Sequence, residues 1–227
     1  LEPYFSERMI RLNSCFLPGD RQRQIGKMTT RSECGLPETT FVFATFNNAY
    51  KLNPVMWDCW MRILRQAPDS VLWVVDDNAW ATEHLRAAAS THGVDDKRLI
   101  FGPRTSHADF LGRLPLADLF LDNHPYNAGS TANDALWMGL PILTLSGRSF
   151  VSRMGGSLLT AAGVPELITY NLTDYEQKAI SLAKNPKDYQ KLRARILRAR
   201  QSPVFDMNRL AQEIEQYFFQ ISRLSKA

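Results

Sequence analysis

Two polar loops in this sequence carry the side chains best suited to bind a charged ligand. One, residues 47–51, reads NNAYK and ends in a lysine; the other, residues 122–131, reads DNHPYNAGST and ends in paired hydroxyls. A helix that begins just beyond a buried strand leaves backbone N–H groups unpaired, and these groups favour phosphate. A flexible lysine can reach such a phosphate and offset its charge. The two loops together predict an anion site, with a diphosphate as the favoured ligand.

The helix predicted to begin at residue 130 holds candidates for phosphate and ribose binding, and each candidate has a plainer alternative. Gly129, Ser130 and Thr131 would cradle the diphosphate, although the two hydroxyls are equally typical of ordinary N-caps. Asp134, one turn later, is placed to accept from ribose hydroxyls, as acidic residues do in nucleotide-binding folds. Its alternative is a helix-start carboxylate that answers Thr131 and the helix dipole. Lys51 is alternatively a solvated surface lysine.

Further candidates flank these positions. Asn48 in the first loop could donate to the same phosphate or hold the turn of its own loop. Arg104, His107 and Arg113 follow a predicted strand and could edge a base pocket, with a solvated surface as the favoured alternative. His124, beside a proline in the second loop, is more typical of a loop-packing residue than of a site residue.

Other chemistries find less support in the sequence. Asp76 and Asp77 are adjacent carboxylates without a third ligand at a recognisable spacing, so no metal site is predicted. The three cysteines are scattered and form no C-x-x-C pair, so neither a disulfide nor a zinc site is predicted. The motifs of dinucleotide dehydrogenases, P-loop enzymes and α/β-hydrolases do not occur. The basic run at residues 184–200 is interpreted as a solvated helix face rather than a docking surface.

Composition narrows the classes further. With 227 residues, 44% hydrophobic and 22% charged, the chain is typical of one globular domain or slightly more. A net charge of +4 suits an anionic small molecule and is too small to indicate nucleic-acid binding. No apolar stretch approaches the ~20 residues of a membrane span, and no signal peptide is visible. We therefore predict a cytoplasmic protein without membrane contact.

Short apolar runs alternate with helical patterns along most of the chain, one helix being opened by a capping box at Thr173 and Glu176. The predicted strands cover residues 41–46, 71–75, 98–101, 117–121, 142–145 and 166–168, and helices begin near residues 54, 80, 106, 130, 149, 173, 186 and 207. This alternation predicts an α/β fold: a doubly wound, Rossmann-like parallel sheet with helices on both faces. In the common order 3-2-1-4-5-6, both polar loops meet where the order reverses, and ligands bind there.

Longer stretches around these loops resemble a known family. FNNAYK at 46–51 and LDNHPYNAGSTANDALWMGLPILTL at 121–145 are similar to the C-terminal half of the O-linked N-acetylglucosamine transferase family, in its bacterial tetratricopeptide-linked form. TTRSECGLPE at 29–38, SVLWVV at 70–75 and RLIFGPR at 98–104 extend the resemblance in order over nearly the whole chain. The resemblance implies the C-terminal half of a two-domain GT-B glycosyltransferase, with a C-terminal crossing helix.

The resemblance further implies an inverting, metal-independent protein O-glycosyltransferase. Its donor is a UDP-sugar, typically UDP-N-acetylglucosamine, its acceptor is a protein Ser or Thr hydroxyl, and no cofactor beyond the nucleotide sugar is implied. By position, Lys51 stabilises the leaving diphosphate, and Asn48 replaces a family glutamine near the phosphates. Ser130 and Thr131 match the phosphate-binding helix start, and Asp134 matches the ribose-binding aspartate.

Near the base, the resemblance implies backbone contacts at Arg104 and Thr105, and Arg113 matches a family arginine. His107 stands where the animal members have a lysine that stacks near the base, and Phe110 where they have a histidine. These departures leave the donor open, with UDP-glucose and GDP-fucose as alternatives.

A further departure motivates a second hypothesis. The animal members have a histidine at Gly129, just before the paired hydroxyls. Together with the change at His107, it suggests a non-catalytic, degenerate domain kept as a scaffold or interaction module. A third hypothesis is an unrelated α/β enzyme with a phosphorylated substrate, which a strand order of 2-1-3-4-5 would indicate.

The resemblance also predicts the domain organisation. Residues 1–38 are expected to be a connecting segment from an N-terminal catalytic domain, itself preceded by helical repeats, and residues 39–227 a nucleotide-sugar-binding domain. The chain is then a fragment, inactive or weakly active without that upstream domain. The last helix, from Met207, would cross back toward the missing domain, and its uncovered aromatic face predicts self-association of the fragment.

Overall fold

Six parallel strands form one sheet whose order reverses once. The computed structural model describes residues 4–13 and 15–224, and within them the order is β3-β2-β1-β4-β5-β6. The strands are β1 Phe41–Thr45, β2 Ser70–Asp76, β3 Leu99–Pro103, β4 Leu119–Leu121, β5 Ile142–Leu145 and β6 Ile168–Thr169. The predicted doubly wound sheet and its strand order are confirmed. The order 2-1-3-4-5, and with it the hypothesis of an unrelated enzyme, is wrong.

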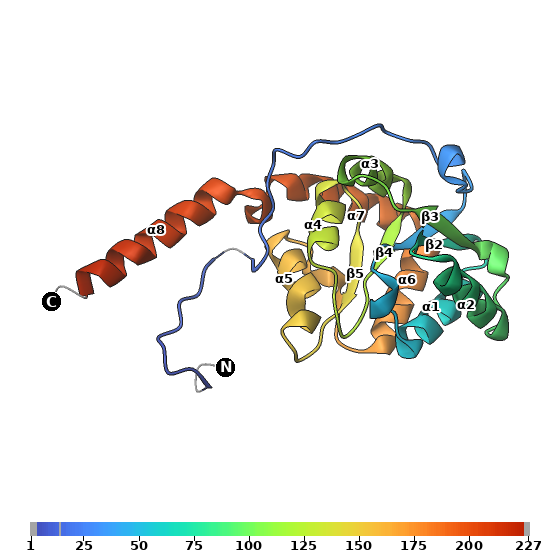
Figure 1. The fold of residues 1–227 in the computed structure, drawn as a ribbon, viewed down its shortest axis with the longest axis horizontal. Coiled ribbons are helices and arrows are strands. Elements are labelled where there is room, and N and C mark those ends of the chain that lie inside the picture. The colour runs from blue at the N-terminus through green and yellow to red at the C-terminus, as the bar shows by residue number, and fades with distance from the viewer. Residues whose placement is uncertain (1–3, 14, 225–227) are drawn as a thin grey trace.

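Helices cover both faces of this sheet (Figure 1). They are α1 Pro54–Gln66, α2 Ala79–Thr91, α3 His107–Arg113, α4 Ser130–Trp137, α5 Met154–Ala161, α6 Leu172–Lys184, α7 Pro186–Arg198 and α8 Met207–Leu224. On one face α1 packs against α6, and on the other α4 packs against α5 and α7. The layers follow from the strand order, because each half of a doubly wound sheet sends its crossover helices to a different face.

Local capping chemistry explains where several helices begin. Asn53 accepts a hydrogen bond from the N–H of Met56 at the start of α1, and Ser106 caps α3 as its residue type predicts. The predicted capping box of α6 is wrong, because Asn171 caps this helix before Thr173 is reached. Glu176 instead accepts from side chains of α1, which ties the two helices together.

Two other predicted boundaries differ from the structure. The strand expected at residues 166–168 is displaced to β6, because residues 165–167 form a 3-10 turn that begins at Pro165. The helix expected at residues 149–162 is shorter, since residues 151–153 form another 3-10 turn before α5. Neither change moves the loops that hold the candidate site.

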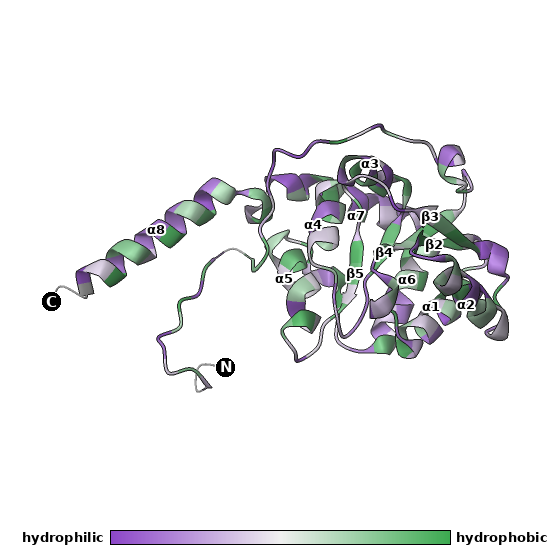
Figure 2. Ribbon diagram, viewed as in Figure 1, coloured by the Kyte–Doolittle hydropathy of each residue, from purple (hydrophilic) through white to green (hydrophobic). Residues whose placement is uncertain are grey.

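The core is built from the strands and the inner faces of α1 and α6. Phe43 and Phe120 on neighbouring strands are fully buried, as are Trp60 and Tyr175, whose indole N–H donates to the phenol oxygen at 3.3 Å. Figure 2 shows the same pattern, with hydrophobic colouring along the central strands and mixed colouring on the helices around them. A sheet covered on both faces requires such continuous apolar strands.

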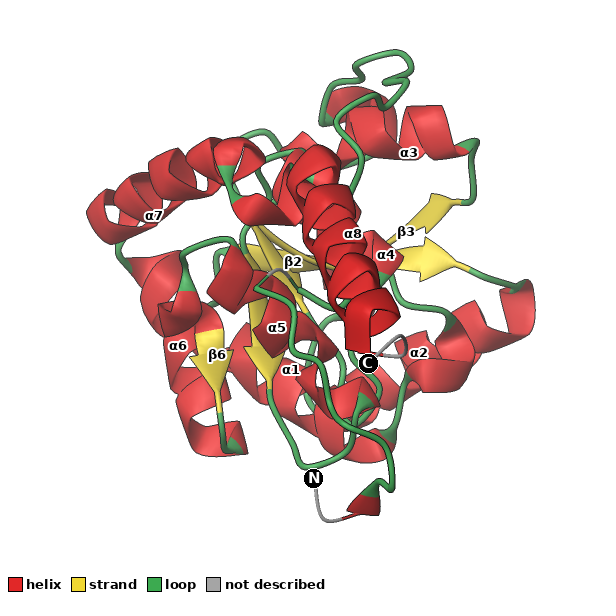
Figure 3. Cartoon of the chain, turned by 90° about the vertical axis from the view of Figure 1, so that its left-hand side faces the viewer, coloured by secondary structure: helices red, strands yellow, loops and turns green. Residues whose placement is uncertain are grey.

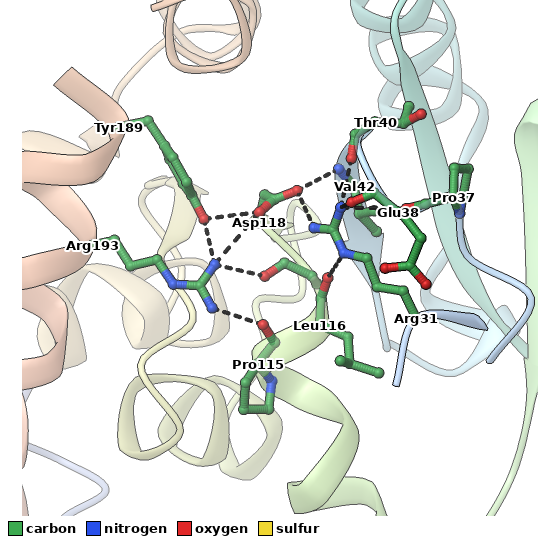
Figure 4. Close-up of polar contacts among 11 residues, drawn as sticks. Arg31, Pro37, Glu38, Thr40, Val42, Pro115, Leu116, Asp118, Tyr189 and Arg193 are labelled. Atoms are coloured by element: carbon green, nitrogen blue, oxygen red, sulfur yellow. Dashed lines mark hydrogen bonds and ion pairs between the residues drawn. The ribbon is translucent and has the colours of Figure 1, made fainter. Parts of the chain in front are cut away.

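The N-terminal segment is fixed to the amino ends of the strands by a polar cluster around Asp118 (Figure 4). Asp118 accepts from Arg31 at 2.7 Å, from the N–H of Val42 at 2.7 Å and from Tyr189 at 3.1 Å. Arg193 donates to the same tyrosine oxygen at 2.6 Å. The cluster joins the segment, β1, β4 and α7 at the edge of the sheet opposite the two polar loops.

Helix α8 extends away from the sheet and its layers in Figure 1, and in Figure 3 the same helix points toward the viewer in front of the sheet. Phe218 and Phe219 on this helix are each 67% exposed. None of the helices in the described part of the chain has the length and apolar character to cross a membrane. The self-association that these aromatic side chains suggested stays a prediction.

Candidate functional site

A pocket of about 340 Å³ opens at the carboxyl ends of β1, β2 and β3, beside the start of α4. Eight of the residues singled out from the sequence line it: Asn48, Arg104, Thr105, His107, Arg113, Ser130, Thr131 and Asp134. The reversal of strand order brings them together, because the loops after β1 and β3 and the start of α4 meet at this edge of the sheet.

Helix α4 begins at Ser130 without a side-chain cap. Gly129 occupies the N-cap position, and no side chain accepts from the first-turn N–H groups. The N-cap explanation of Ser130 and Thr131 is therefore wrong, and both residues line the pocket instead. An uncapped helix start at a pocket wall is the arrangement that receives phosphate oxygens. Gly129 itself does not line the pocket, and a Cβ there would lie 2.8 Å from Cε of Met154.

Asp134 connects the pocket with the N-terminal segment. Its Oδ2 lies 2.9 Å from Nε2 of His107, and its Oδ1 accepts from Nη1 of Arg23. These are its side-chain partners within the described residues, so the interpretation that it answers Thr131 is wrong. Arg23 was missed by the sequence reasoning, because nothing in the pattern of residues 1–38 shows which helix that segment contacts.

Arg104 joins the loops that follow β1, β2 and β3. Its Nη2 donates to Oδ1 of Asn48 at 2.7 Å, and its Nε donates to Oδ1 of Asp77 at 3.0 Å. The hydrogen bond from Arg104 holds the pKa of Asp77 below its ordinary value. Asp76 accepts from Thr82 instead, so the adjacent carboxylates have separate partners. Within the described chain, no group of three or more His, Cys, Asp or Glu side chains is placed to hold a metal ion.

Lys51 lies on the loop beside the pocket rather than in its wall. Its Nζ is 3.9 Å from the centroid of the Tyr126 ring, a cation–π distance, and its carbonyl oxygen accepts from Asn123. Burial lowers the pKa of Lys51, and the charges of Tyr50 and Asp122 oppose that shift. The expectation that Lys51 and the start of α4 share one pocket wall is not met, because the ring of Tyr126 holds the ammonium outside it.

Asp122, directly after β4, holds the second polar loop in shape. Its Oδ2 accepts from the hydroxyl of Thr144 at 2.6 Å, and its Oδ1 accepts from the N–H groups of Ala128 and Asn123 at 2.7 and 2.8 Å. The side chain is completely buried, and burial raises its pKa to about 7, against the opposing effect of these hydrogen bonds and of Lys51.

His124 packs within the same loop, as its sequence context predicts. Its Nδ1 lies 3.1 Å from the carbonyl oxygen of Leu145, and its own carbonyl accepts from the side chain of Asn53 at 2.6 Å. It does not line the pocket. Its role in the structure is to connect the loop after β4 with β5 and with the start of α1.

Aromatic side chains form a second part of the pocket that the sequence reasoning did not anticipate. Phe46 packs edge-on against Trp73 at 5.1 Å and against Phe110 at 5.3 Å, and all three line the pocket. Nε1 of Trp73 and Nε of Arg113 are buried without a hydrogen-bond partner in the described chain. The apolar runs that contain Phe46 and Trp73 were interpreted only as strands. A planar, partly polar ligand group suits such a surface.

Comparison with known proteins shows to which family this chain belongs. Residues 10–214 match the family described as Glycosyl transferase family 41. The chain belongs to this family. Its resemblance to the O-linked N-acetylglucosamine transferases, drawn from the loop motifs, is thereby confirmed.

Relatives of this family 41 chain are much longer than the chain itself. It is 32% identical over 228 residues to the Arabidopsis thaliana protein SEC, named a probable UDP-N-acetylglucosamine–peptide N-acetylglucosaminyltransferase, over 97% of this chain and 23% of that protein. It is 33% identical over 189 residues to the Caenorhabditis elegans UDP-N-acetylglucosamine–peptide N-acetylglucosaminyltransferase, over 83% of this chain and 16% of that protein. A mutant of the Thermobaculum terrenum O-GlcNAc transferase matches with a TM-score of 0.81 and 27% identity, over 93% of this chain and 40% of that one.

Proposed function

We propose that this chain binds a UDP-sugar as the donor-binding part of an inverting, metal-independent protein O-glycosyltransferase. The favoured donor is UDP-N-acetylglucosamine. The observation that carries the proposal is a buried aspartate, Asp134, one turn into an uncapped helix at the wall of a pocket with aromatic lining. Membership of family 41 and the names of its relatives, UDP-N-acetylglucosamine–peptide N-acetylglucosaminyltransferases, support it.

The pocket offers a separate surface to each part of a nucleoside diphosphate. The rings of Phe46, Trp73 and Phe110 receive the base. Arg104 and Arg113 line the same pocket. Asp134 accepts from the ribose hydroxyls, since a carboxylate has about four lone-pair sites and contacts within the described residues use two of them. The diphosphate then reaches the N–H groups at the start of α4, where Thr131 stands.

In an inverting transfer, the serine or threonine oxygen of a protein acceptor forms a bond to C1 of the sugar from the face opposite the nucleotide. The bond from C1 to the phosphate oxygen breaks, UDP leaves with the bonding electrons, and the hydroxyl proton passes to a base. This chain contributes stabilisation of the charge on the departing diphosphate, from the α4 start and from Lys51. Lys51 must leave the Tyr126 ring to do so, which its four-carbon stem permits. Because the α4 start and Lys51 offset the charge of the leaving diphosphate, the proposal requires no metal ion for this purpose.

Isothermal titration calorimetry with UDP, UDP-N-acetylglucosamine, UDP-glucose and GDP-fucose tests the proposal. We expect the three uridine nucleotides to bind and GDP-fucose to give no heat. Lys51→Ala should weaken UDP more than uridine, because only the diphosphate uses the ammonium, whereas Asp134→Asn should weaken both. Lys187→Ala, an exposed lysine at the start of α7, serves as the matched control and should bind like the wild type. No heat from any nucleotide would defeat the proposal.

One observation favours a second candidate, a non-catalytic scaffold. Both carboxylate oxygens of Asp134 already have partners in this chain, His107 and Arg23. If these contacts close the site permanently, the domain is folded and stable yet binds no nucleotide. A cooperative thermal unfolding transition that no nucleotide shifts would favour the scaffold, because a ligand that binds only the folded state must raise the transition temperature.

A further inference from the structure

The part of the N-terminal segment that passes the pocket, residues 17–28, is called the strap here. Figure 1 shows this blue segment running past α4 and α3. Its backbone is fixed on both sides of its midpoint: Leu17 accepts from the side chain of Asn133 at 2.9 Å, and Gly26 donates to the carbonyl of Ala108 at 2.8 Å. Between them, Gly19 donates to the carbonyl of Val204 at 2.7 Å. The strap is therefore held closely against the helices that form the pocket.

Three strap or helix glycines show how tight this contact is. A Cβ on Gly19 would lie 2.3 Å from Oδ1 of Asn133, and one on Gly26 would lie 2.9 Å from the backbone of Ala108. A Cβ on Gly112 of α3 would lie 2.4 Å from the carbonyl oxygen of Lys27. Side chains cannot be added at these positions without moving backbone or polar groups, so the strap has one close-fitting position.

Arg23, in the middle of the strap, is directed into the protein. Its Nε donates to the carbonyl of Asp20 at 2.8 Å, Nη1 donates to Asp134 and Nη2 donates to Asn133. The guanidinium carbon lies 5.5 Å from the ring centroid of Trp137 and 5.4 Å from that of Phe205, and the side chain is 10% exposed. A guanidinium that donates to three acceptors and lies over two rings has little freedom to move.

Asp134 lies between this arginine and the pocket. Arg23 bonds Oδ1 but does not line the pocket, whereas the other carboxylate oxygen lies beside His107 in the pocket wall. We propose that Arg23 is a positioning residue that aims the Asp134 carboxylate at the ribose hydroxyls of the bound nucleotide. This inference rests on the proposed donor-binding function. Its physical basis is that a carboxylate fixed before binding loses less freedom when it accepts the hydroxyls.

The chain supplies a matched control for the structural part of this contact. Arg200 also lies over the Trp137 ring, at 5.1 Å from its centroid, and donates to the carbonyl oxygen of the same residue. Within the described part of the chain its side chain contacts Trp137 and Met138 and makes no hydrogen bond to Asp134. Arg200→Met therefore removes a half-buried arginine contact from the same tryptophan without touching the carboxylate that faces the pocket.

The test compares calorimetric affinities for UDP and for 2′,3′-dideoxy-UDP, which lacks both ribose hydroxyls. For the wild type we expect UDP to bind about tenfold more tightly or better, the effect of a hydrogen bond to a charged group. Arg23→Met should reduce this ratio to about threefold or less by weakening UDP while leaving the dideoxy nucleotide nearly unchanged. Arg200→Met should keep the wild-type ratio, and Arg23→Lys, which keeps the charge without the fork, should give an intermediate ratio.

The outcomes separate this inference from the proposed function. A wild-type ratio in Arg23→Met, or an equal loss of affinity for both nucleotides, overturns the positioning role and leaves donor binding intact. A wild type that binds both nucleotides equally well removes Asp134 from ribose binding and overturns the inference as well. A wild type that binds neither defeats the proposed function and the inference together. If Arg23→Met does not fold, the ratio measured for Arg23→Lys decides, and an unchanged ratio there overturns the inference.

Discussion

The two ends of β4 each carry an aspartate, and the two carboxyl groups have opposite surroundings. Asp118 at the amino end has the guanidinium of Arg31 at 2.7 Å and that of Arg193 at 3.5 Å. Asp122 at the carboxyl end is completely buried, and among the residues that the structure describes its carboxyl group accepts from a hydroxyl and two backbone N–H groups. The strand between them is three residues long. Charged pairs therefore hold the closed edge of the sheet, while the edge with the pocket keeps a carboxyl group that can titrate.

The N-terminal segment contributes to both edges through two arginines. Arg31 donates to the carbonyls of Thr40 and Leu116 as well as to Asp118, so all its bonds join parts of the framework. Arg23 of the strap bonds Asp134, which lines the pocket. An arginine–aspartate pair therefore has two different roles in this chain. Arg31 and Asp118 join parts of the framework, whereas Arg23 bonds an aspartate whose other oxygen faces the pocket.

The largest effect is expected from breaking the amino-end cluster. Arg31→Met removes the cation beside a carboxylate that is 12% exposed, and breaking such a pair costs about 3 kcal/mol. Chemical denaturation should show this loss in the free energy of unfolding. The affinity of the folded variant for UDP should not change, because the cluster lies at the opposite edge of the sheet. A large loss of affinity without a loss of stability would contradict the assigned roles.

A smaller effect is expected where the strap crosses α3. Gly112→Ala places a Cβ against the carbonyl of Lys27, and overpacking against backbone costs about 2 kcal/mol. Gly156→Ala in α5 is the matched control, since its nearest neighbours lie at 3.6 Å and alanine favours a helix by about 1 kcal/mol over glycine. Thermal unfolding should rank the control at or above the wild type and Gly112→Ala below it. Equal transition temperatures would show that the strap does not fit closely.

The smallest effect over any one pH unit, a slope of stability against pH, is expected at the carboxyl end of β4. The pKa of Asp122 is raised to about 7 in the folded protein, so between about pH 4 and pH 7 the folded state binds a proton that the unfolded state has lost. Its contribution to stability is therefore present at low pH and is lost as the pH rises, by up to about 1.4 kcal/mol per pH unit. Asp122→Asn, which is neutral throughout, should remove this part of the slope. Parallel pH profiles of unfolding free energy would contradict the raised pKa.

The strands and most of the polar residues of the pocket could be predicted from the sequence, because they depend on local patterns. Alternating apolar runs predict parallel strands, and turn residues such as those around Gly129 mark where loops begin. The aromatic part of the pocket could not be predicted, because the pattern of Trp73 in an apolar run is the same in a core and in a pocket wall. The position of Lys51 over the Tyr126 ring was also missed, since two loops must first be placed side by side.

The sequence by itself determined that the fold is a doubly wound parallel sheet and which family the chain resembles, while it left two strand orders open. Periodicity and loop motifs are local properties, and they survive without any knowledge of distant contacts. Only the tertiary structure decided that Arg23 meets Asp134 across 111 positions of the chain. The physical reason is that an irregular segment takes its path from the surfaces on which its side chains pack, and its own pattern carries no record of those surfaces.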